Sequence, residues 1–339
     1  MPVVLVLSRQ GTKFCRKTCF PKFSLPRSRK FHVQRNLRNR SQYGKGTGKN
    51  DIQPEMPEGV SKLRMIMRPL GFTIMTGAVS FGTCSILHYE RVRNLYIRGS
   101  LERNWPTRRF PKLFGIRDVL NKWWNSLPEG QKTVVGIIFL NTAVFSLWRI
   151  PRMQHFMFKW FTSSPVAASS ATLLSSTFSH KDFWHLAVNM FVLWSFAPGM
   201  EAHLGKEQFL AFYITGGVAA SFASVAHRIA ISNFFSASLG ASGALFAVLS
   251  YVAIHQPDLR LAIVFLPFFT FSAGSGLLAM VGIDVAGLLF RWNLFDHAGH
   301  LGGVLLGAWY LKFGHHYLWE KRGWLVSRWH KLREGYKRT

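Results

Sequence analysis

The sequence predicts an all-α membrane protein with seven helices that cross the bilayer. Its 339 residues are 48% hydrophobic and only 17% charged, and its mean hydropathy is positive. The apolar residues are gathered into runs, several of them near the roughly 20 residues that a helix needs to cross the hydrocarbon core. The formal net charge is +27, and the basic residues lie mostly outside these runs, at the two ends and in one loop. That distribution favours contact with an anionic membrane surface over nucleic-acid binding.

Residues 1–50 have the composition of a mitochondrial transit peptide. They contain no Asp or Glu and are dense in Arg and Lys, with Ser and Thr interspersed. We expect this segment to be removed; the alternative is a disordered basic arm that binds RNA. Two of the three cysteines, Cys15 and Cys19, lie in it, which leaves Cys84 alone. The sequence therefore indicates neither a disulfide framework nor a metal cluster, and we expect no cofactor.

Residues 51–132 are predicted to hold a linker, the first transmembrane helix and a basic loop. The helix is expected over residues 69–89, a run without formal charge that lies between Arg68 and Glu90. Residues 90–132 are polar and basic, and we expect a long loop there.

Residues 133–314 are predicted to form a core of six further spans. We expect these spans near residues 133–149, 182–200, 206–226, 240–256, 260–281 and 295–314. Residues 150–181, after the first of them, are Ser-rich and aromatic, which suits the bilayer interface. The tail, residues 315–339, carries three Trp among Lys and Arg. This composition indicates an interfacial anchor on anionic lipid, with a partner-binding helix as the alternative.

Polar groups inside apolar spans are costly, so each one is a candidate functional group. The sequence Gly240-Ala241-Ser242-Gly243 opens the span at 240–256 after a polar approach. Ser242 is therefore expected in the first turn of a helix that begins below the membrane surface. The glycines let a substrate backbone come close, and free N–H groups of the first turn suit a developing oxyanion. The alternative is a contact between helices made by small residues.

The last span carries a histidine on a glycine-lined face. His300, Gly303 and Gly307 stand at i, i+3 and i+7, so they share one side of a helix. The two glycines let another helix approach closely, which brings His300 within reach of a facing residue. If that residue is Ser242, the two form an activated nucleophile and its base. Asp296 could be proposed as the acid of a triad, but we expect it to cap this helix.

A third polar group lies on the span at 182–200. His185 and Asn189 stand at i and i+4 on one helix face. Both can donate hydrogen bonds and could line an oxyanion pocket together with the backbone N–H of Ser242. The alternative is a buried polar contact that holds helices together.

Taken together, these motifs resemble the rhomboid intramembrane proteases. They are, in chain order, His185-x-x-x-Asn189, Gly240-x-Ser242-Gly243 and His300-x-x-Gly303-x-x-x-Gly307. Further segments, such as Phe178-Ser179-His180, are similar to those of the mitochondrial, presenilin-associated rhomboid-like branch. Members of that branch also have a basic presequence. The resemblance covers residues 133–314. It implies a six-helix core preceded by one extra N-terminal transmembrane helix, a 1+6 arrangement.

The resemblance also implies roles for the site residues. Ser242 would be the nucleophile and His300 the general base, as a dyad without an acid. His185, Asn189 and Gly240 would support the oxyanion site. Substrates would be single-span proteins of the inner mitochondrial membrane, and the branch is associated with processing of a mitophagy kinase and of a dynamin-related fusion GTPase. One departure is His203, which stands where bacterial relatives have Arg, and which can alter a contact that anchors a loop.

Two other classes remain open from the sequence. One is a transporter or channel whose intramembrane His and Ser residues carry protons or ions. The other is an inactive rhomboid relative that binds membrane proteins, although such relatives usually lack the serine or the histidine. A metalloprotease is disfavoured because no His-Glu-x-x-His occurs.

The orientation of the site in the membrane also stays open. If the N-terminus faces the matrix, the basic loop and tail lie on the side where positive charge is not expected.

Overall fold

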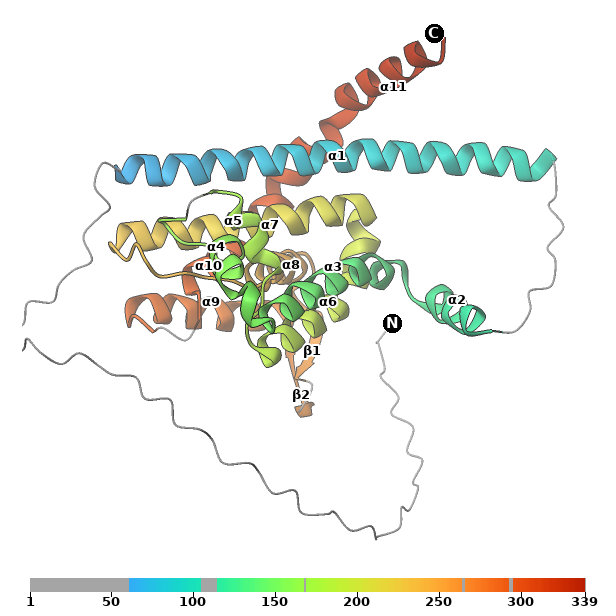
Figure 1. Cartoon of the computed structure of the whole chain (residues 1–339). Helices are drawn as coiled ribbons and strands as arrows, with labels where there is room; N and C mark the ends of the chain where they lie inside the picture. The colour runs from blue at the N-terminus through green and yellow to red at the C-terminus, as the bar shows by residue number, and fades with distance from the viewer. Residues whose placement is uncertain (1–60, 105–114, 168, 264–265, 293–294, 339) are drawn as a thin grey trace, which may run out of the picture. The chain divides into compact units, whose positions relative to one another are not determined.

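The computed structural model describes residues 61–104, 115–167, 169–263, 266–292 and 295–338 (Figure 1). These residues are mostly helical, as the predicted class requires, but they include one short β-hairpin. The expected transit peptide, residues 1–50, lies outside the described residues.

The first helix, α1 (Lys62–Asn104), contains the predicted span over residues 69–89 and extends well beyond it. Its 43 residues reach about 65 Å at the rise of an α-helix, roughly twice the thickness of the hydrocarbon core. The prediction of a loop from residue 90 is therefore wrong as far as residue 104. A further part of the predicted loop also folds, as the amphipathic helix α2 (Ile116–Ser126).

Charged residues continue α1 because they find partners on helices far along the chain. Arg91 meets the buried carboxylate of Glu207 with two nitrogens, at 2.7 Å for Nε–Oε1 and 2.8 Å for Nη2–Oε2. Glu90 accepts a hydrogen bond of 2.9 Å from Nε1 of Trp329. Straight-chain charged residues are also good helix formers, so neither residue ends the helix.

The core helices follow the predicted order. They are α3 (Glu129–Trp148), α6 (Phe183–Leu204), α7 (Lys206–Ala230), α8 (Ser242–His255), α9 (Ala273–Leu289) and α10 (His297–Trp309). Among the described residues α1, α3 and α7 are long and apolar enough to cross a membrane, and α8 and α9 are shorter apolar helices. The full arrangement of one plus six spans stays a prediction. The chain leaves α10 through the π-helical stretch η3 (Tyr310–Trp319), the short turn η4 (Glu320–Arg322) and the helix α11 (Gly323–Arg338).

The predicted span at 260–281 is wrong in its first half. Residues there form the antiparallel strands β1 (Arg260–Ile263) and β2 (Leu266–Ser272), and α9 begins only at Ala273, capped by the Ser272 hydroxyl. The run is rich in aromatic and branched apolar residues, which favour strands. A short apolar run without clear periodicity does not distinguish a strand from a helix. This helix therefore ends at residue 289 and not at residue 281.

The described part of residues 150–181 contains four short helical segments. These are η1 (Pro151–Met153), α4 (Gln154–Trp160), α5 (Thr172–Ser175) and η2 (Ser176–Phe178). The aromatic residues Phe156 and Phe158 are exposed, while Leu173 and Ser176 are buried. Backbone hydrogen bonds of 2.8 Å run in both directions between Ser163 and Ser238. The segment is thereby fixed against the chain that leads into α8.

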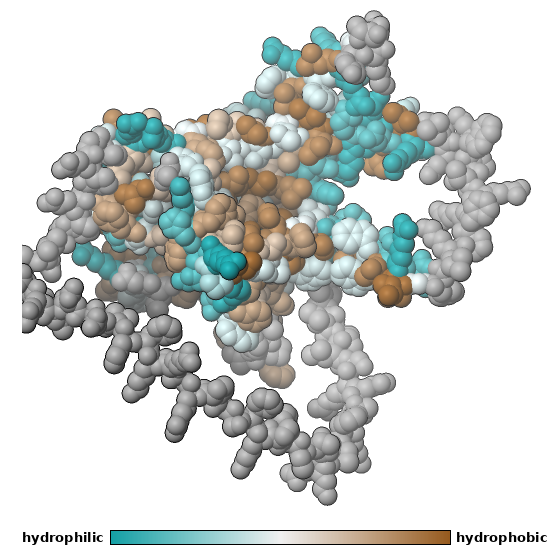
Figure 2. All heavy atoms as spheres, viewed as in Figure 1, coloured by the Kyte–Doolittle hydropathy of each residue, from teal (hydrophilic) through white to brown (hydrophobic). Residues whose placement is uncertain are grey.

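The described surface carries many large apolar side chains. Figure 2 shows hydrophobic residues over much of the face in view. Phe139 of α3, Leu278 and Leu289 of α9 and Leu305 of α10 are all exposed. Water-soluble monomers rarely expose so much contiguous apolar surface, whereas lipid tails would cover it. The interior, in contrast, is packed around aromatic residues such as Phe212, Tyr251 and Tyr310.

Candidate active site

Ser242 is the first residue of α8, as the sequence predicted. The chain reaches it through Gly240, whose φ of +133° lies in the region that favours glycine. The N–H of Gly240 donates to the carbonyl of Ser176 at 2.9 Å, and the N–H of Ala241 donates to Nε2 of His180 at 3.3 Å. Both contacts come from the segment before α6. The turn that presents the Ser242 hydroxyl is therefore held from outside its own helix.

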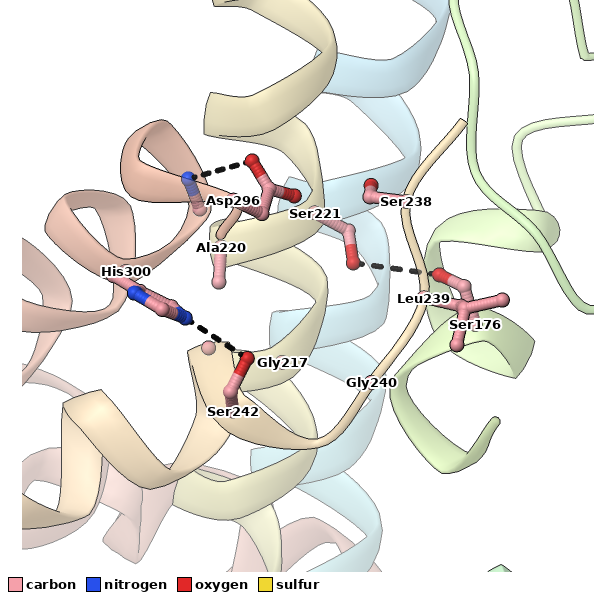
Figure 3. A pocket seen from close by; sticks show the side chains of 12 residues that line it. Ser176, Gly217, Ala220, Ser221, Ser238, Leu239, Gly240, Ser242, Asp296 and His300 are labelled. Carbon is pink, nitrogen blue, oxygen red and sulfur yellow. Dashed lines mark hydrogen bonds between the residues drawn. The ribbon is translucent and has the colours of Figure 1, made fainter. Parts of the chain in front are cut away.

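His300 lies opposite this serine on α10. Its Nε2 is 3.1 Å from Oγ of Ser242, a contact drawn as a dashed line in Figure 3. The imidazole stacks on the ring of Phe246, with centroids 4.0 Å apart and planes 6° from parallel. His300 is 8% exposed, so its ring is enclosed by packing. A hydroxyl and an imidazole at this distance can share a proton, which is what a nucleophile and its base require.

Glycines bring α10 and α8 into this close contact. A Cβ on Gly303 would overlap the carbonyl oxygen of Gly243, and a Cβ on Gly307 would overlap that of Ala247. No other residue fits at either position without moving a backbone. The sequence proposed these glycines as helix-packing residues, and their surroundings support that proposal.

His185 and Asn189 lie on α6, behind the chain that precedes Ser242. Nε2 of His180 accepts from Nδ2 of Asn189 at 2.8 Å as well as from Ala241 N–H, so His180 joins α6 to the approach to the nucleophile. His185 packs against Gly240, where an added Cβ would lie 2.8 Å from its Cε1. Neither His185 nor Asn189 is among the residues that line the pocket at Ser242. An oxyanion role for them stays a prediction.

The pocket beside Ser242 is lined by both polar and apolar residues (Figure 3). The Oγ atoms of Ser176 and Ser221 lie 3.5 Å apart across it. Its lining consists of Ser176, Gly217, Ala220, Ser221, Ser238, Leu239, Gly240, Ser242, Gly243, Asp296, Gly299 and His300. The hydroxyl groups could hold water close to Ser242, in a protein that exposes many large apolar side chains.

Asp296 has the capping role that the sequence favoured. Its Oδ1 accepts from the N–H of Gly299 at 3.3 Å, in the first turn of α10. The carboxylate also accepts from Oγ of Ser224 at 2.6 Å and lies 3.7 Å from the guanidinium of Arg228. Its partners are therefore the helix end and α7, and no contact with the His300 side chain is among them.

Asp284 of α9 is a site residue that was not predicted from the sequence. This residue is 3% exposed, and its Oδ1 lies 3.1 Å from Nδ1 of His300 and 2.7 Å from Nδ1 of His297. The predicted span ended at residue 281, so Asp284 was expected in a loop, where an ionisable side chain is ordinary. With α9 over residues 273–289, Asp284 is an ionisable group inside an apolar helix and therefore a functional candidate.

Within the described residues, no group of three or more His, Cys, Asp or Glu side chains is arranged to hold a metal ion. The expectation that the protein needs no metal or cofactor stays a prediction.

Comparisons with known proteins agree on one family. A family model described as Rhomboid domain matches residues 168–317. Presenilin-associated rhomboid-like protein, mitochondrial, of Mus musculus is 44% identical over 276 residues, which cover 80% of this chain and 73% of the mouse protein. The human protein of the same description is 43% identical over 276 residues, with 80% and 72% covered. Rhomboid protein 1, mitochondrial, of Saccharomyces cerevisiae is 33% identical over 200 residues, with 58% and 54% covered.

The fold and the site define a class, a helical membrane protein with a serine and a histidine paired among its helices. The similarity to the mouse and human proteins narrows this class. The chain belongs to the rhomboid family, in its mitochondrial presenilin-associated rhomboid-like branch. It is a mitochondrial, multi-pass membrane protein and a rhomboid protease, a kind of enzyme that acts on membrane proteins.

Proposed function

We propose that this chain is a serine-type endopeptidase of the inner mitochondrial membrane, with Ser242 as nucleophile and His300 as general base. The observation that carries the proposal is the distance of 3.1 Å between Oγ of Ser242 and Nε2 of His300. This pair lies beside a pocket that serine hydroxyls help to line, in a chain that exposes many large apolar side chains.

The proposed reaction is acyl transfer to the serine followed by hydrolysis. Nε2 of His300 takes the proton of Oγ while Oγ attacks the scissile carbonyl, which gives a tetrahedral oxyanion. As the C–N bond breaks, His300 returns this proton to the leaving amine. A water molecule then attacks the acyl-serine and gives a proton to His300. As the bond between the acyl carbon and Oγ breaks, His300 passes this proton to Oγ, which restores both Ser242 and the neutral imidazole. The serine hydroxyls of the pocket are suited to supply that water.

The oxyanion would be stabilised at the start of α8. The first N–H groups of a helix have no partner within it and carry a partial positive charge, so they suit a developing negative oxygen. We propose that the N–H of Ser242 is the first donor and that His185 and Asn189 support it, with Gly240 adopting the backbone conformation that presents this turn.

The proposed substrates are single-span mitochondrial membrane proteins. A transmembrane helix has its carbonyl groups hydrogen-bonded, so the substrate must unwind locally before Ser242 can reach one. By family resemblance, we propose that this cleavage takes part in mitochondrial fusion, dynamics and mitophagy.

The basic, Trp-containing tail would lie against anionic lipid headgroups. We expect no role for nucleic acid, metal or cofactor, so a chelator should leave activity unchanged.

The test is cleavage of a tagged single-span reporter by the full chain in proteoliposomes. Ser242→Ala and His300→Ala should each lower the cleavage rate by at least about 10³-fold, because nucleophile and base act as a unit. Ser195→Ala is the matched control, since the Ser195 hydroxyl only bonds back to the carbonyl of Phe191 in its own helix. Equal cleavage by wild type and Ser242→Ala would overturn the proposal.

A further inference from the structure

Three ionisable side chains meet where α9 crosses α10. Oδ1 of Asp284 lies 3.1 Å from Nδ1 of His300 and 2.7 Å from Nδ1 of His297. All three residues are at least nine-tenths buried. The other nitrogen of His300 faces Ser242, so Ser242, His300 and Asp284 follow one another in a continuous chain of hydrogen bonds.

We propose that Asp284 is a positioning residue for the base, so that the site works as Ser242–His300–Asp284 rather than as a dyad. This inference rests on the proposed function. An ionised carboxylate can only accept hydrogen bonds, so Nδ1 of His300 must carry a proton to make this contact. A neutral imidazole with its proton on Nδ1 has a lone pair on Nε2, the atom that faces the Ser242 hydroxyl. Asp284 thereby selects the tautomer that can act as the base.

Asp284 also faces the charge that forms during the reaction. When Nε2 takes the serine proton, His300 becomes an imidazolium in a buried site where water does not screen charge. A carboxylate on the opposite side of the ring stabilises that cation without taking its proton. This carboxylate stabilises the transition state more than the resting enzyme, so its loss should lower kcat.

His297 fixes the carboxylate from the other side. Its Nδ1 donates to the same oxygen that His300 uses. Its Nε2 is buried and has no hydrogen-bond partner among the described residues, and its ring lies directly on Gly287, where a Cβ would overlap it. The ring is therefore held by packing against α9 and by one hydrogen bond. We assign His297 to orienting Asp284 rather than to proton transfer.

Asp296 does not serve in this place. Its carboxylate accepts hydrogen bonds from the N-terminus of α10 and from Ser224, and it lies near Arg228. Among the described residues, Asp284 is the carboxylate that contacts the His300 ring.

The experiment compares purified, reconstituted variants by kcat, KM and the rate at which a fluorophosphonate probe labels Ser242. Asp284→Asn keeps the shape and removes the charge. It should lower kcat and the labelling rate by about 10²-fold or more, with KM changed by less than about threefold. Asp284→Glu should recover part of kcat because the charge returns one methylene away. Asp258→Asn, an exposed acid outside the site, is the matched control and should behave as wild type.

His297→Phe tests the orienting role separately, because the ring can still pack on Gly287 while the hydrogen bond to Asp284 is lost. It should lower kcat less than Asp284→Asn does. Should Asp284→Asn fail to fold, Asp284→Leu takes its place, because an apolar side chain of similar size is readily accepted in a membrane helix. A wild-type kcat in either Asp284→Asn or Asp284→Leu overturns the inference.

A purely structural role for Asp284 has a different signature. Asp284→Asn would then lower thermal stability and the amount of folded enzyme, with kcat per active site unchanged, and Asp284→Glu would rescue nothing. Failure of the proposed function is also distinct. Ser242→Ala with wild-type activity overturns that function, whereas an inactive Ser242→Ala beside a fully active Asp284→Asn overturns only the role of Asp284.

Discussion

Gly303 of α10 lies so close to Gly243 of α8 that a Cβ at position 303 would overlap the carbonyl oxygen of Gly243. This approach sets the distance between the helices that carry His300 and Ser242. The distance between the candidate base and nucleophile therefore depends on the packing of these two glycines.

Gly303→Ala should separate these helices and impair both stability and activity. Overpacking a close contact typically costs about 1–3 kcal/mol. The thermal unfolding midpoint of the detergent-solubilised protein and the cleavage rate should both fall. Gly136→Ala on α3 is the matched control, because nothing lies within 4 Å of the added Cβ there. Equal effects of the two substitutions would contradict the close approach.

Gly240→Ala should lower activity through strain in the turn before Ser242. Gly240 has a φ of +133°, and an added Cβ would lie 2.8 Å from Cε1 of His185. An unfavourable backbone conformation of this kind costs about 1–3 kcal/mol. Adding His185→Ala removes the clash and leaves the strain, so the double variant should recover stability only in part. Full recovery would show that the backbone conformation is not constrained, and Gly199→Ala serves as the open-space control.

His180→Ala should affect the site about as strongly as Asn189→Ala. His180 accepts from both Asn189 and the N–H of Ala241, so its loss leaves a buried donor without a partner, at about 1–3 kcal/mol. Because the two side chains act through one contact, their effects on kcat/KM should not add in a double-mutant cycle. Simple additivity would show that Asn189 acts independently of His180.

Glu207→Gln should loosen α1 from the core. The buried Glu207 carboxylate receives Nε and Nη2 of Arg91, and the amide keeps only part of this paired contact. The expected loss is about 1–3 kcal/mol, read as a lower thermal unfolding midpoint. Glu129→Gln breaks the more exposed pair with Lys132 and should cost less than about 1 kcal/mol. Equal midpoints for the two variants would argue against α1 being held at this contact.

The sequence predicted the features that depend on local spacing. Ser242 at a helix start, the glycine-lined face of α10 and the cap at Asp296 each follow from residues within one or two turns. The length of α1 could not be predicted in this way, because Arg91 is paired with Glu207, a residue more than a hundred positions away.

Asp284 shows how one wrong helix boundary hides a functional candidate. The apolar run that contains β1 and β2 has no periodicity that distinguishes strands from a buried helix, so the predicted span began and ended too early. Asp284 was then expected in a loop, where an acidic residue does not indicate a functional site. Its contact with His300 also depends on how α9 crosses α10, and that angle is a property of packing rather than of spacing.

The most direct test of the account is whether Ser242 is nucleophilic because of His300. The full chain in liposomes is treated with a fluorophosphonate probe, and the modified residue is located by peptide mass spectrometry in wild type and His300→Ala. We predict an adduct on Ser242 in the wild type and about 10³-fold slower labelling, or none, in His300→Ala. An unmodified Ser242 in active wild-type protein, or equal labelling rates in the two proteins, would contradict the account.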